Sequence, residues 1–596
     1  MTLTTGIVAP PGAIDGRPAR SRRGTATDAR SAALCRAARV DTLLKNPYDP
    51  AGEHGFAAFL AADQERRPAR SAERLLADAG LAAEFVPARH GGGLTRADLL
   101  MKVLRPVFRR DVALGFAGGV TSLFAASAVW AAGTDAQQRA LARLLLGGGH
   151  ATVVHPGLAP AGGIRREEVT ARRTVDGTAM LVSGRKDVII DAARANVYVV
   201  HARTAETGPR THSVLLLDPA QLPGTTLQRL ARVATDGMRS AVFSGLRFTR
   251  CPVSDDALVG RPGDGAALAL RMNQANRCLV AGAASAALDP VLRAAVHTAT
   301  DGRTGPPARR WHRPLAGVFT DLLVCDALAT VCLRALGLLP DQAHAPTVAA
   351  TYTVPALLTD ALEELSAVLG THGGGDDLLH GILAKLARDL PAAGLGRDGA
   401  AACQAVILPQ LGALARQSWL VEEEPPAELF RRRADLPPLD HGALAFAGGG
   451  DFLAAALTAA AERLGRARRA GGRIALLADL AEAFLTELRL LREQCALLPG
   501  QFGDALSGPA ACALSDRYGL LAAAAAVLAV WEGQEADDPF LADPDWALLA
   551  LSRLGRRLAI TLPDVPGTCV TGVLDELLRR HHTGRSFDLD GAELAL

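Results

Sequence analysis

The sequence of 596 residues is poor in aromatic residues and has no long uninterrupted apolar segment. Phenylalanine, tryptophan and tyrosine together make up 4% of the chain. The most apolar run, from Gly519 to Trp531, is shorter than the ~20 residues that a helix needs to cross a bilayer. We therefore expect this run to be a buried helix, and we expect no membrane span.

The sequence also lacks the cysteine and histidine clusters that bind metals. Its nine cysteines are scattered without a Cys-x-x-Cys pair, and none of its 14 histidines has metal-ligand spacing. This pattern predicts reduced thiols in a cytoplasmic protein, with no metal site. Residues 1–40 are rich in arginine and proline and lack the apolar core of a secretory signal, so we expect a disordered tail there.

A charge excess of either sign is absent as well. The chain has 64 Lys plus Arg and 62 Asp plus Glu, which leaves a net charge of +2. This balance predicts no partner that binds through charge alone, such as nucleic acid or an anionic membrane. No Gly-x-Ser-x-Gly elbow, Walker loop or Rossmann glycine run occurs.

The apolar pattern changes along the chain in a way that predicts several domains. Helical spacing dominates up to about residue 150, short β-branched runs follow, and helical spacing then returns. A segment rich in proline and glutamate precedes four further amphipathic, alanine-rich helices. The predicted divisions are a tail (1–40), an N-terminal α-helical domain (41–150), a β-domain (151–262), a helical bundle (263–420), a linker (421–442) and a C-terminal helical extension (443–596).

A series of landmarks in sequence order resembles the acyl-CoA dehydrogenase family over roughly residues 70–416. The landmarks are Gly184 and Lys186 on a strand, Gly237–Ser240, Phe248–Val253, the glycine-rich Gly260–Gly265, and Arg277 in the helix that follows. The resemblance implies a mostly α-helical fold with a central small β-domain: an N-terminal helical domain, a β-barrel and a four-helix bundle, here with an additional C-terminal extension.

The same resemblance implies an FAD-dependent dehydrogenase that desaturates an acyl thioester between Cα and Cβ. Relatives place their catalytic carboxylate, followed by glycine, soon after an Arg-Asp pair, which here is Arg388 and Asp389. Asp398 precedes Gly399 and is the only such carboxylate in the loop, so Asp398 is the candidate base. An N-cap for the following helix is the alternative role, because Asp next to Gly before an alanine-rich helix is typical of a cap.

Substrate contacts are implied for Arg277 and for Gln274, which lies one turn earlier on the same helix. The resemblance places the cofactor contacts at Val154 and Ile190, where relatives have threonine, at Arg303, and at Gly370 and Gly373 in a glycine-rich turn. Each hydroxyl lost at Val154 or Ile190 would remove ~1 kcal/mol of binding. FAD is therefore the expected cofactor, with binding that these two replacements weaken or abolish.

Two other functions are compatible with the sequence. In one, the same fold carries out a non-desaturating or flavin-independent step. In the other, the chain is a non-catalytic interaction protein in which the C-terminal helices matter most. For the FAD-dependent dehydrogenase we expect an acyl-CoA or acyl-carrier-protein substrate and a specialised biosynthetic pathway. We also expect a homodimer or homotetramer, because relatives complete each flavin site with residues from a neighbouring subunit.

Overall fold

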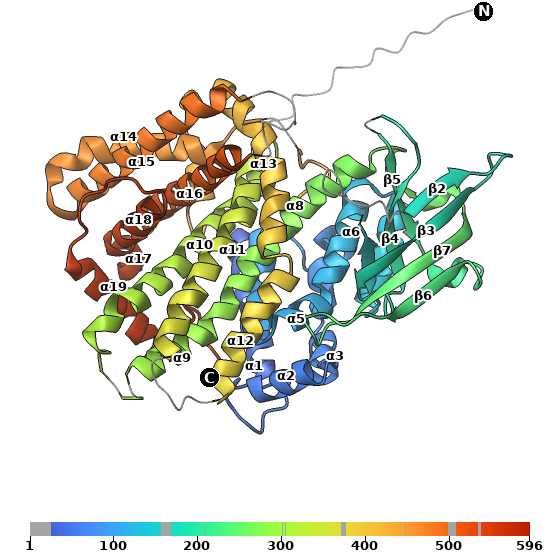
Figure 1. Cartoon of the computed structure of the whole chain (residues 1–596), viewed down its shortest axis with the longest axis horizontal. Helices are drawn as coiled ribbons and strands as arrows, with labels where there is room; N and C mark the ends of the chain where they lie inside the picture. Colours follow the sequence, from blue (N-terminus) through green and yellow to red (C-terminus); the bar gives the residue numbers. More distant parts are fainter. Residues whose placement is uncertain are drawn as a thin grey trace, which may run out of the picture.

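The structure is a computed structural model that describes residues 25–155, 169–208, 210–300, 302–303, 305–370, 377–446, 449–498, 508–534 and 538–596. A β-domain lies at one end of the molecule, helices fill the middle, and the C-terminal extension lies at the other end (Figure 1). This arrangement confirms the fold class expected from the sequence: mostly α-helical, with a β-domain between two helical regions of the sequence and extra C-terminal helices.

The N-terminal domain is helical, and its first helix begins earlier than expected. Helix α1 runs over Thr25–Leu44, so the disordered tail predicted up to residue 40 is wrong from residue 25 onwards. Ala33, Val40 and Leu44 of α1 are buried, and the helix packs on α4. Arginines between these positions mask the apolar spacing. The other helices are α2 (Phe56–Gln64), α3 (Arg70–Asp78), α4 (Ala97–Arg110), α5 (Val112–Gly115), α6 (Thr121–Ala132) and α7 (Asp135–Leu146).

The β-domain is one mixed sheet with strand order β6-β7-β3-β2-β4-β5-β8, and β1 pairs with β4. Strand β4 is buried at five successive positions because it has neighbours on both sides, whereas the edge strand β6 is largely exposed. The strands are β1 (Ala151–Val154), β2 (Val169–Arg173), β3 (Met180–Ile190), β4 (Val197–Arg203), β5 (His212–Leu217), β6 (Leu227–Arg232), β7 (Phe243–Val253) and β8 (Leu258–Val259).

The bundle follows the β-domain directly. Helix α10 is almost entirely buried, because helices pack around it from the N-terminal domain, the bundle and the extension. Figure 1 shows α10 and α11 near the centre of the molecule. The bundle helices are α8 (Gly265–Ala284), α9 (Asp289–Ala299), α10 (His312–Leu338), α11 (His344–Gly370), α12 (Asp377–Ala392) and α13 (Arg397–Gln417).

The C-terminal extension packs on the bundle through α15, α16, α18 and α19, and it contains more helices than the four expected. Helix α19 was missed because glycine and β-branched residues fill its first two turns, and these residues have low helix propensity. The helices of the extension are α14 (Phe452–Ala467), α15 (Gly472–Ala496), α16 (Pro509–Glu532), the short α17 (Pro539–Ala542), α18 (Asp545–Arg557) and α19 (Gly567–His582).

Four described segments are long and apolar enough to cross a membrane by length and composition alone. Between 78% and 100% of the residues in their most apolar windows are buried within the fold. Their apolar surface is therefore covered by the protein itself. The segments are Val112–Ala132, Gly265–Ala299, Arg309–Leu338 and Pro509–Glu532, the last of which contains the run from Gly519 to Trp531.

A buried ion pair fastens the extension to the bundle. Asp321 on α10 is 1% exposed and accepts hydrogen bonds from Arg553 Nε at 2.9 Å and Arg557 Nη2 at 3.0 Å, both on α18. Removing one partner of a buried pair leaves the other charge without compensation, which costs more than the pair itself contributes. We therefore expect the interface between α10 and α18 to be sensitive to the charge at Asp321.

We predict that Asp321→Asn lowers the stability of the protein by ~3 kcal/mol, because Arg553 and Arg557 lose the buried carboxylate that they share and keep only the more exposed Glu364 and Asp360. Denaturant unfolding of the wild type and the variant measures the loss. Asp360→Asn is the matched control: Asp360 also pairs with Arg557, but its side chain is 51% exposed, so its loss should cost ~1 kcal/mol or less. Equal effects of the two substitutions would contradict this prediction.

Candidate active site

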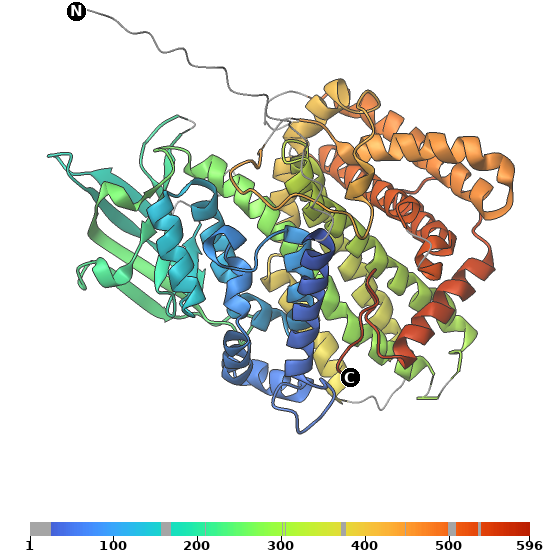
Figure 2. The ribbon, with the colours of Figure 1, turned by 180° about the vertical axis from the view of Figure 1, so that it is seen from behind.

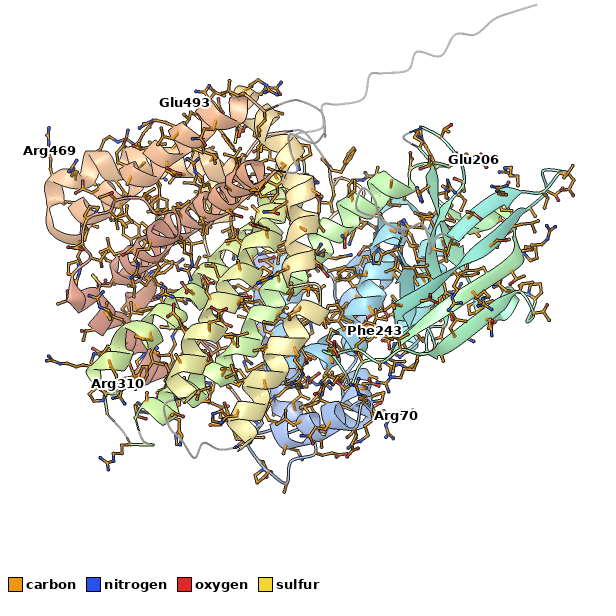
Figure 3. The ribbon with its side chains drawn as sticks, in the orientation of Figure 1. Arg70, Glu206, Phe243, Arg310, Arg469 and Glu493 are labelled. Carbon is orange, nitrogen blue, oxygen red and sulfur yellow. The ribbon has the colours of Figure 1, made fainter. Side chains whose placement is uncertain are left out.

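The candidate site lies where the β-domain meets the bundle. The ends of β1 and β3, the turn before β7, helix α8 and the loop between α12 and α13 all supply residues to this junction. Figure 3 shows Phe243, the first residue of β7, on the side of the β-domain that faces the helices.

Arg277 fixes the loop that carries the predicted base. Its guanidinium Nη2 donates a hydrogen bond of 2.9 Å to the Gly394 carbonyl. A Cβ at Gly399 would lie 1.9 Å from that carbonyl oxygen and 2.6 Å from Arg277 Nη2, so only glycine allows this approach. The structure thus brings together Arg277 and the segment around Asp398, which are far apart in the sequence.

Asp398 is the second residue of α13, and its side chain is exposed. The N-cap position is Gly396, and no side chain caps this helix. The alternative role of Asp398 as the N-cap is therefore wrong. An exposed carboxylate beside Arg277 can act as a base only when a bound substrate excludes water from it, because the reaction needs a desolvated carboxylate.

Gln274 offers an unused hydrogen-bond donor. Its side chain is 8% exposed, and its amide nitrogen has no hydrogen-bond partner. Buried donors without a partner are costly, so such an atom is a candidate for a ligand contact. The neighbouring Asn276 differs, because its amide pairs with the Ser127 hydroxyl at 3.1 Å. Gln274 and Arg277 therefore supply N–H groups from the same helix.

His155 lies at this junction and was not among the site residues predicted from the sequence. It follows β1, is exposed, and lies between Phe124 and His201, with ring centroids 6.4 Å apart in both pairs. Although the residue is exposed as a whole, the groups packed around its ring partly desolvate it, and together with the positive charges of Lys186 and Arg277 they lower the pKa of His155 to about 4. The imidazole is therefore neutral at physiological pH. Its position directly after a predicted strand was the one sequence feature that could have indicated His155 as a site residue.

An apolar wall occupies the position expected for the flavin ring. Ala113, Met238 and Ala241 form a buried cluster, and the partly buried Ile190 and Phe243 pack against it. Ile190 therefore contributes packing to this wall and no hydrogen bond. The backbone of the turn before β7 is strained at Met238, because its φ of 48° lies in the left-handed region that residues other than glycine rarely adopt.

Val154 does not reach this wall with its side chain. It is 0% exposed and packs in the core of the β-domain with Val182, Tyr198 and other strand residues. Thr152, two residues earlier on the same side of the strand, donates its hydroxyl to the Ile190 carbonyl at 2.7 Å. A ligand at the junction could therefore contact only the backbone of Val154.

The described residues fit a flat, apolar ring by packing but give it no side-chain hydroxyl. Ile190, Met238 and Phe243 form the apolar surface, and β1 ends at the same junction. A flavin ring placed here would be held mainly by packing and by backbone donors, which is weaker than a site with two additional hydroxyl groups.

A buried triad supports the turn that forms this wall. Met238 donates its backbone N–H to Asp389 on α12 at 2.6 Å. Lys385 lies between Asp389 and Asp111 and contacts both, with 2.5 Å to Asp111. A Cβ at Gly237 would lie 2.0 Å from the Arg388 carbonyl, so glycine is required where the turn meets α12. The landmark turn and the Arg-Asp pair seen in the sequence are therefore direct neighbours.

Electrostatics explain why the triad holds together. Burial raises the pKa of Asp389, and the neighbouring charge of Asp111 raises it further, while Lys385 opposes both. Burial alone would lower the pKa of Lys385, but the two carboxylates overcome this effect and raise it. Lys385 is therefore charged and keeps two buried carboxylates close to each other.

The residues expected at the dinucleotide lie away from the junction. Arg303 is exposed in the loop between α9 and α10, and Gly370 is exposed at the end of α11, with open space around its Cα. Gly373 lies outside the described residues. In a single chain these positions do not meet Arg277, so their proposed role depends on a neighbouring subunit.

Solved structures identify the fold. The chain resembles an acyl-CoA dehydrogenase complexed with FAD from Bacillus anthracis, with a TM-score of 0.63 and 14% identity over 92% of this chain and 95% of that chain. It also resembles butyryl-CoA dehydrogenase from Megasphaera elsdenii, with a TM-score of 0.51 and 16% identity over 65% of this chain and 97% of that chain.

A third similar structure is a prolyl acyl carrier protein oxidase, with a TM-score of 0.52 and 18% identity over 65% of this chain and 98% of that chain. No family model and no curated protein sequence matches this chain. The chain therefore has the acyl-CoA dehydrogenase fold. The match to the Bacillus anthracis protein covers 92% of this chain, which is more than residues 1–442 contain. The match therefore includes a large part of the C-terminal extension.

We predict that Lys385→Met leaves Asp111 and Asp389 buried together without a cation, so that one of them takes up a proton. The variant should lose ~3–5 kcal/mol of stability at neutral pH. A carboxyl group whose pKa is raised in the folded state stabilises the fold fully at a pH below its unfolded-state pKa of about 4. This contribution is lost as the pH rises through the folded-state pKa. Melting temperatures from pH 5 to 8 should therefore fall more steeply in the variant than in the wild type.

The control for this prediction is the double variant Lys385→Met with Asp389→Asn. It removes one of the two carboxylates, so the steep pH dependence should disappear while the loss of the lysine remains. If Lys385→Met alone keeps the pH profile of the wild type, the buried lysine does not hold the two carboxylates together.

Proposed function

We propose that this protein is a divergent acyl-CoA dehydrogenase that uses FAD to desaturate an acyl thioester in a specialised biosynthetic pathway. The observation that carries the proposal is the contact between Arg277 and the loop before α13, which places a guanidinium and the Asp398 segment side by side at the junction of the two domains. The fold, shared with a dehydrogenase that binds FAD, supports the same assignment.

The residues of the chain have distinct roles in this proposal. Asp398 takes the α-proton of the thioester, and the N–H groups of Arg277 and Gln274 stabilise the negative charge that develops on the thioester carbonyl oxygen. His155, neutral at physiological pH, adds a hydrogen-bonding group without adding charge. The thioester is carried by coenzyme A or by an acyl carrier protein, as with the similar prolyl acyl carrier protein oxidase.

FAD would supply the chemistry that no side chain provides, by accepting the β-hydrogen as hydride. Ile190, Met238 and Phe243 would pack against its ring, and backbone groups at the end of β1 would contact its polar edge. Arg303 and the turn after Gly370 would hold the dinucleotide from a neighbouring subunit. A cytoplasmic homodimer or homotetramer is therefore part of the proposal.

One observation favours a second function. Val154 is buried in the β-domain core and Ile190 packs into the apolar wall, so neither offers the flavin a hydrogen bond. A chain that has lost FAD would keep Asp398, Arg277 and Gln274, and these can still remove and return an α-proton without any oxidation. The alternative is therefore a flavin-independent step on the same class of thioester.

Flavin binding separates the two functions. We predict that the purified wild type has the absorbance of oxidised flavin, or acquires it when FAD is added. Ile190→Thr should raise the affinity for FAD about fivefold, because one added hydroxyl contributes ~1 kcal/mol. Val154→Thr is the matched control, since its hydroxyl would be buried in the β-domain core and should lower the melting temperature without any gain in affinity.

The absence of bound flavin in the wild type and in Ile190→Thr at saturating FAD would reject the dehydrogenase and leave the flavin-independent function. Equal gains in affinity from the two threonine variants would instead show that Val154 reaches the ligand.

The base is tested by hydrogen exchange, which does not require oxidation. We predict that the wild type exchanges the α-hydrogens of a straight-chain acyl-CoA with deuterium oxide, and that Asp398→Asn abolishes this exchange, because an amide cannot accept the proton. Mass spectrometry of the recovered thioester measures the exchange. Asp398→Glu should restore part of it, whereas Asp435→Asn, an exposed aspartate in the linker, should have no effect. Full exchange in Asp398→Asn would remove Asp398 from the mechanism.

A further inference from the structure

A ligand-sized space lies away from the candidate active site. It is a cavity of about 530 Å³ enclosed by α1, α4, the linker near Arg432 and the segment after α19. Figure 2 shows this face of the molecule, with the C-terminal segment in dark red close to the dark-blue α1. The residues that surround the cavity are all described, and the proposed function uses none of them.

Basic side chains outnumber acidic ones around this cavity. Seven cations and four carboxylates belong to its lining, although the chain as a whole is nearly neutral. The cations are Arg30, Lys102, Arg105, Arg109, Arg432, Arg433 and Arg585, and the carboxylates are Asp41, Asp588, Asp590 and Glu593.

Several of these cations are already neutralised. Lys102 lies 2.7 Å from Asp590, Arg105 lies 3.0 Å from Asp588, and both also contact the buried Asp326 on α10. Arg30 lies 2.5 Å from Asp590. These pairs join the C-terminal segment to α1 and α4, and they leave little charge for a ligand at that part of the cavity.

The positive charge of Arg109 is compensated much less well by nearby carboxylates. Arg109 is 6% exposed, and among the residues that the structure describes its only carboxylate contact is Asp41 at 3.5 Å. Asp41 is shared with the buried Arg110 at 3.4 Å and also accepts the backbone N–H of Ala595. The Nε atoms of Arg109 and Arg110 have no hydrogen-bond partner. Burial lowers the pKa of Arg110 to about 10, and the charge of Arg109 adds to this shift.

Two buried guanidinium groups with one carboxylate are electrostatically unfavourable. A buried charge without adequate compensation is destabilising, and arginine binds carboxylate and phosphate groups through charge-assisted hydrogen bonds. An anion in the cavity would supply the missing charge at Arg109. The opposite wall is partly apolar, because Leu34, Ala37 and Ala38 of α1 line it.

We propose that this cavity binds a small organic anion, with a phosphate or carboxylate group at Arg109 and an apolar part against α1. Arg585 and Leu594 of the C-terminal segment line the same space. A bound anion would therefore also hold that segment against α1 and α4. The site is independent of the acyl thioester and of FAD.

The experiment measures melting temperature and heat of binding while sodium phosphate, pyrophosphate or citrate is added at constant ionic strength. At least one of these anions should raise the melting temperature of the wild type in a saturable way. Phosphate and pyrophosphate on one side and citrate on the other distinguish a phosphate ligand from a carboxylate ligand. Equal, non-saturable effects of all salts would overturn the proposal.

Arg109→Gln tests the assignment of the residue. The affinity of the Arg109→Gln variant for the anion should fall about tenfold or more, because a charge-assisted hydrogen bond is lost. Its melting temperature without anion should not fall, since Arg110 then keeps Asp41 to itself. An unchanged affinity in this variant would contradict the proposal.

Two further variants keep the test decisive. Arg585→Gln removes an exposed cation of the lining and should weaken binding even if Arg109→Gln fails to fold. Arg39→Gln is the matched control, because Arg39 is an exposed residue of α1 outside the cavity, and its affinity should equal that of the wild type. Equal weakening in Arg39→Gln and Arg585→Gln would show only general charge screening, and the proposal would be rejected.

Discussion

Helix α4 is buried along its whole length although five of its 14 residues are charged. Burying an ion costs several kcal/mol unless another group compensates it, so each charge on α4 requires a partner from elsewhere in the chain. Asp98 is matched by Arg96 and by Arg334 of α10, and Arg105 by Asp326 of α10. The pKa of Asp326 is lowered as a result, because the nearby cations overcome its desolvation. The positions of α1, α10 and the C-terminal segment relative to one another depend on this matching.

The same principle separates what the sequence could predict from what it could not. Apolar spacing and turn residues are local, and they indicated the β-domain and the bundle helices, whereas the contact of Arg277 with the loop before α13 became evident only from the structure. Ion pairs between distant segments leave no local pattern. Nothing around Lys385 indicates that Asp111 lies beside it, and nothing around Arg105 indicates that Asp588 does. The boundary of the tail was misplaced for the same reason, since the arginines of α1 resembled those of a solvated segment.

The candidate site shows a further limit of sequence reasoning. Matching Val154 to a threonine of relatives says nothing about the direction of its side chain, which strand alternation and packing determine. The structure directs it into the β-domain core, whereas Ile190 faces the apolar wall. Gln274 could be selected from the sequence, but its unused amide nitrogen became evident only from the contacts around it. The donors on α8 are thus better supported than the contacts expected for the flavin ring.

The contact between the C-terminal segment and α4 has a consequence for synthesis of the protein. Lys102 and Arg105 leave the ribosome hundreds of residues before Asp588 and Asp590, which neutralise them in the finished fold. Until then, among the described residues only Asp326 of α10 balances these two cations, so the burial of α4 is incompletely compensated. The charge balance of α4 is therefore complete only when the last residues of the chain have been synthesised and have packed against it.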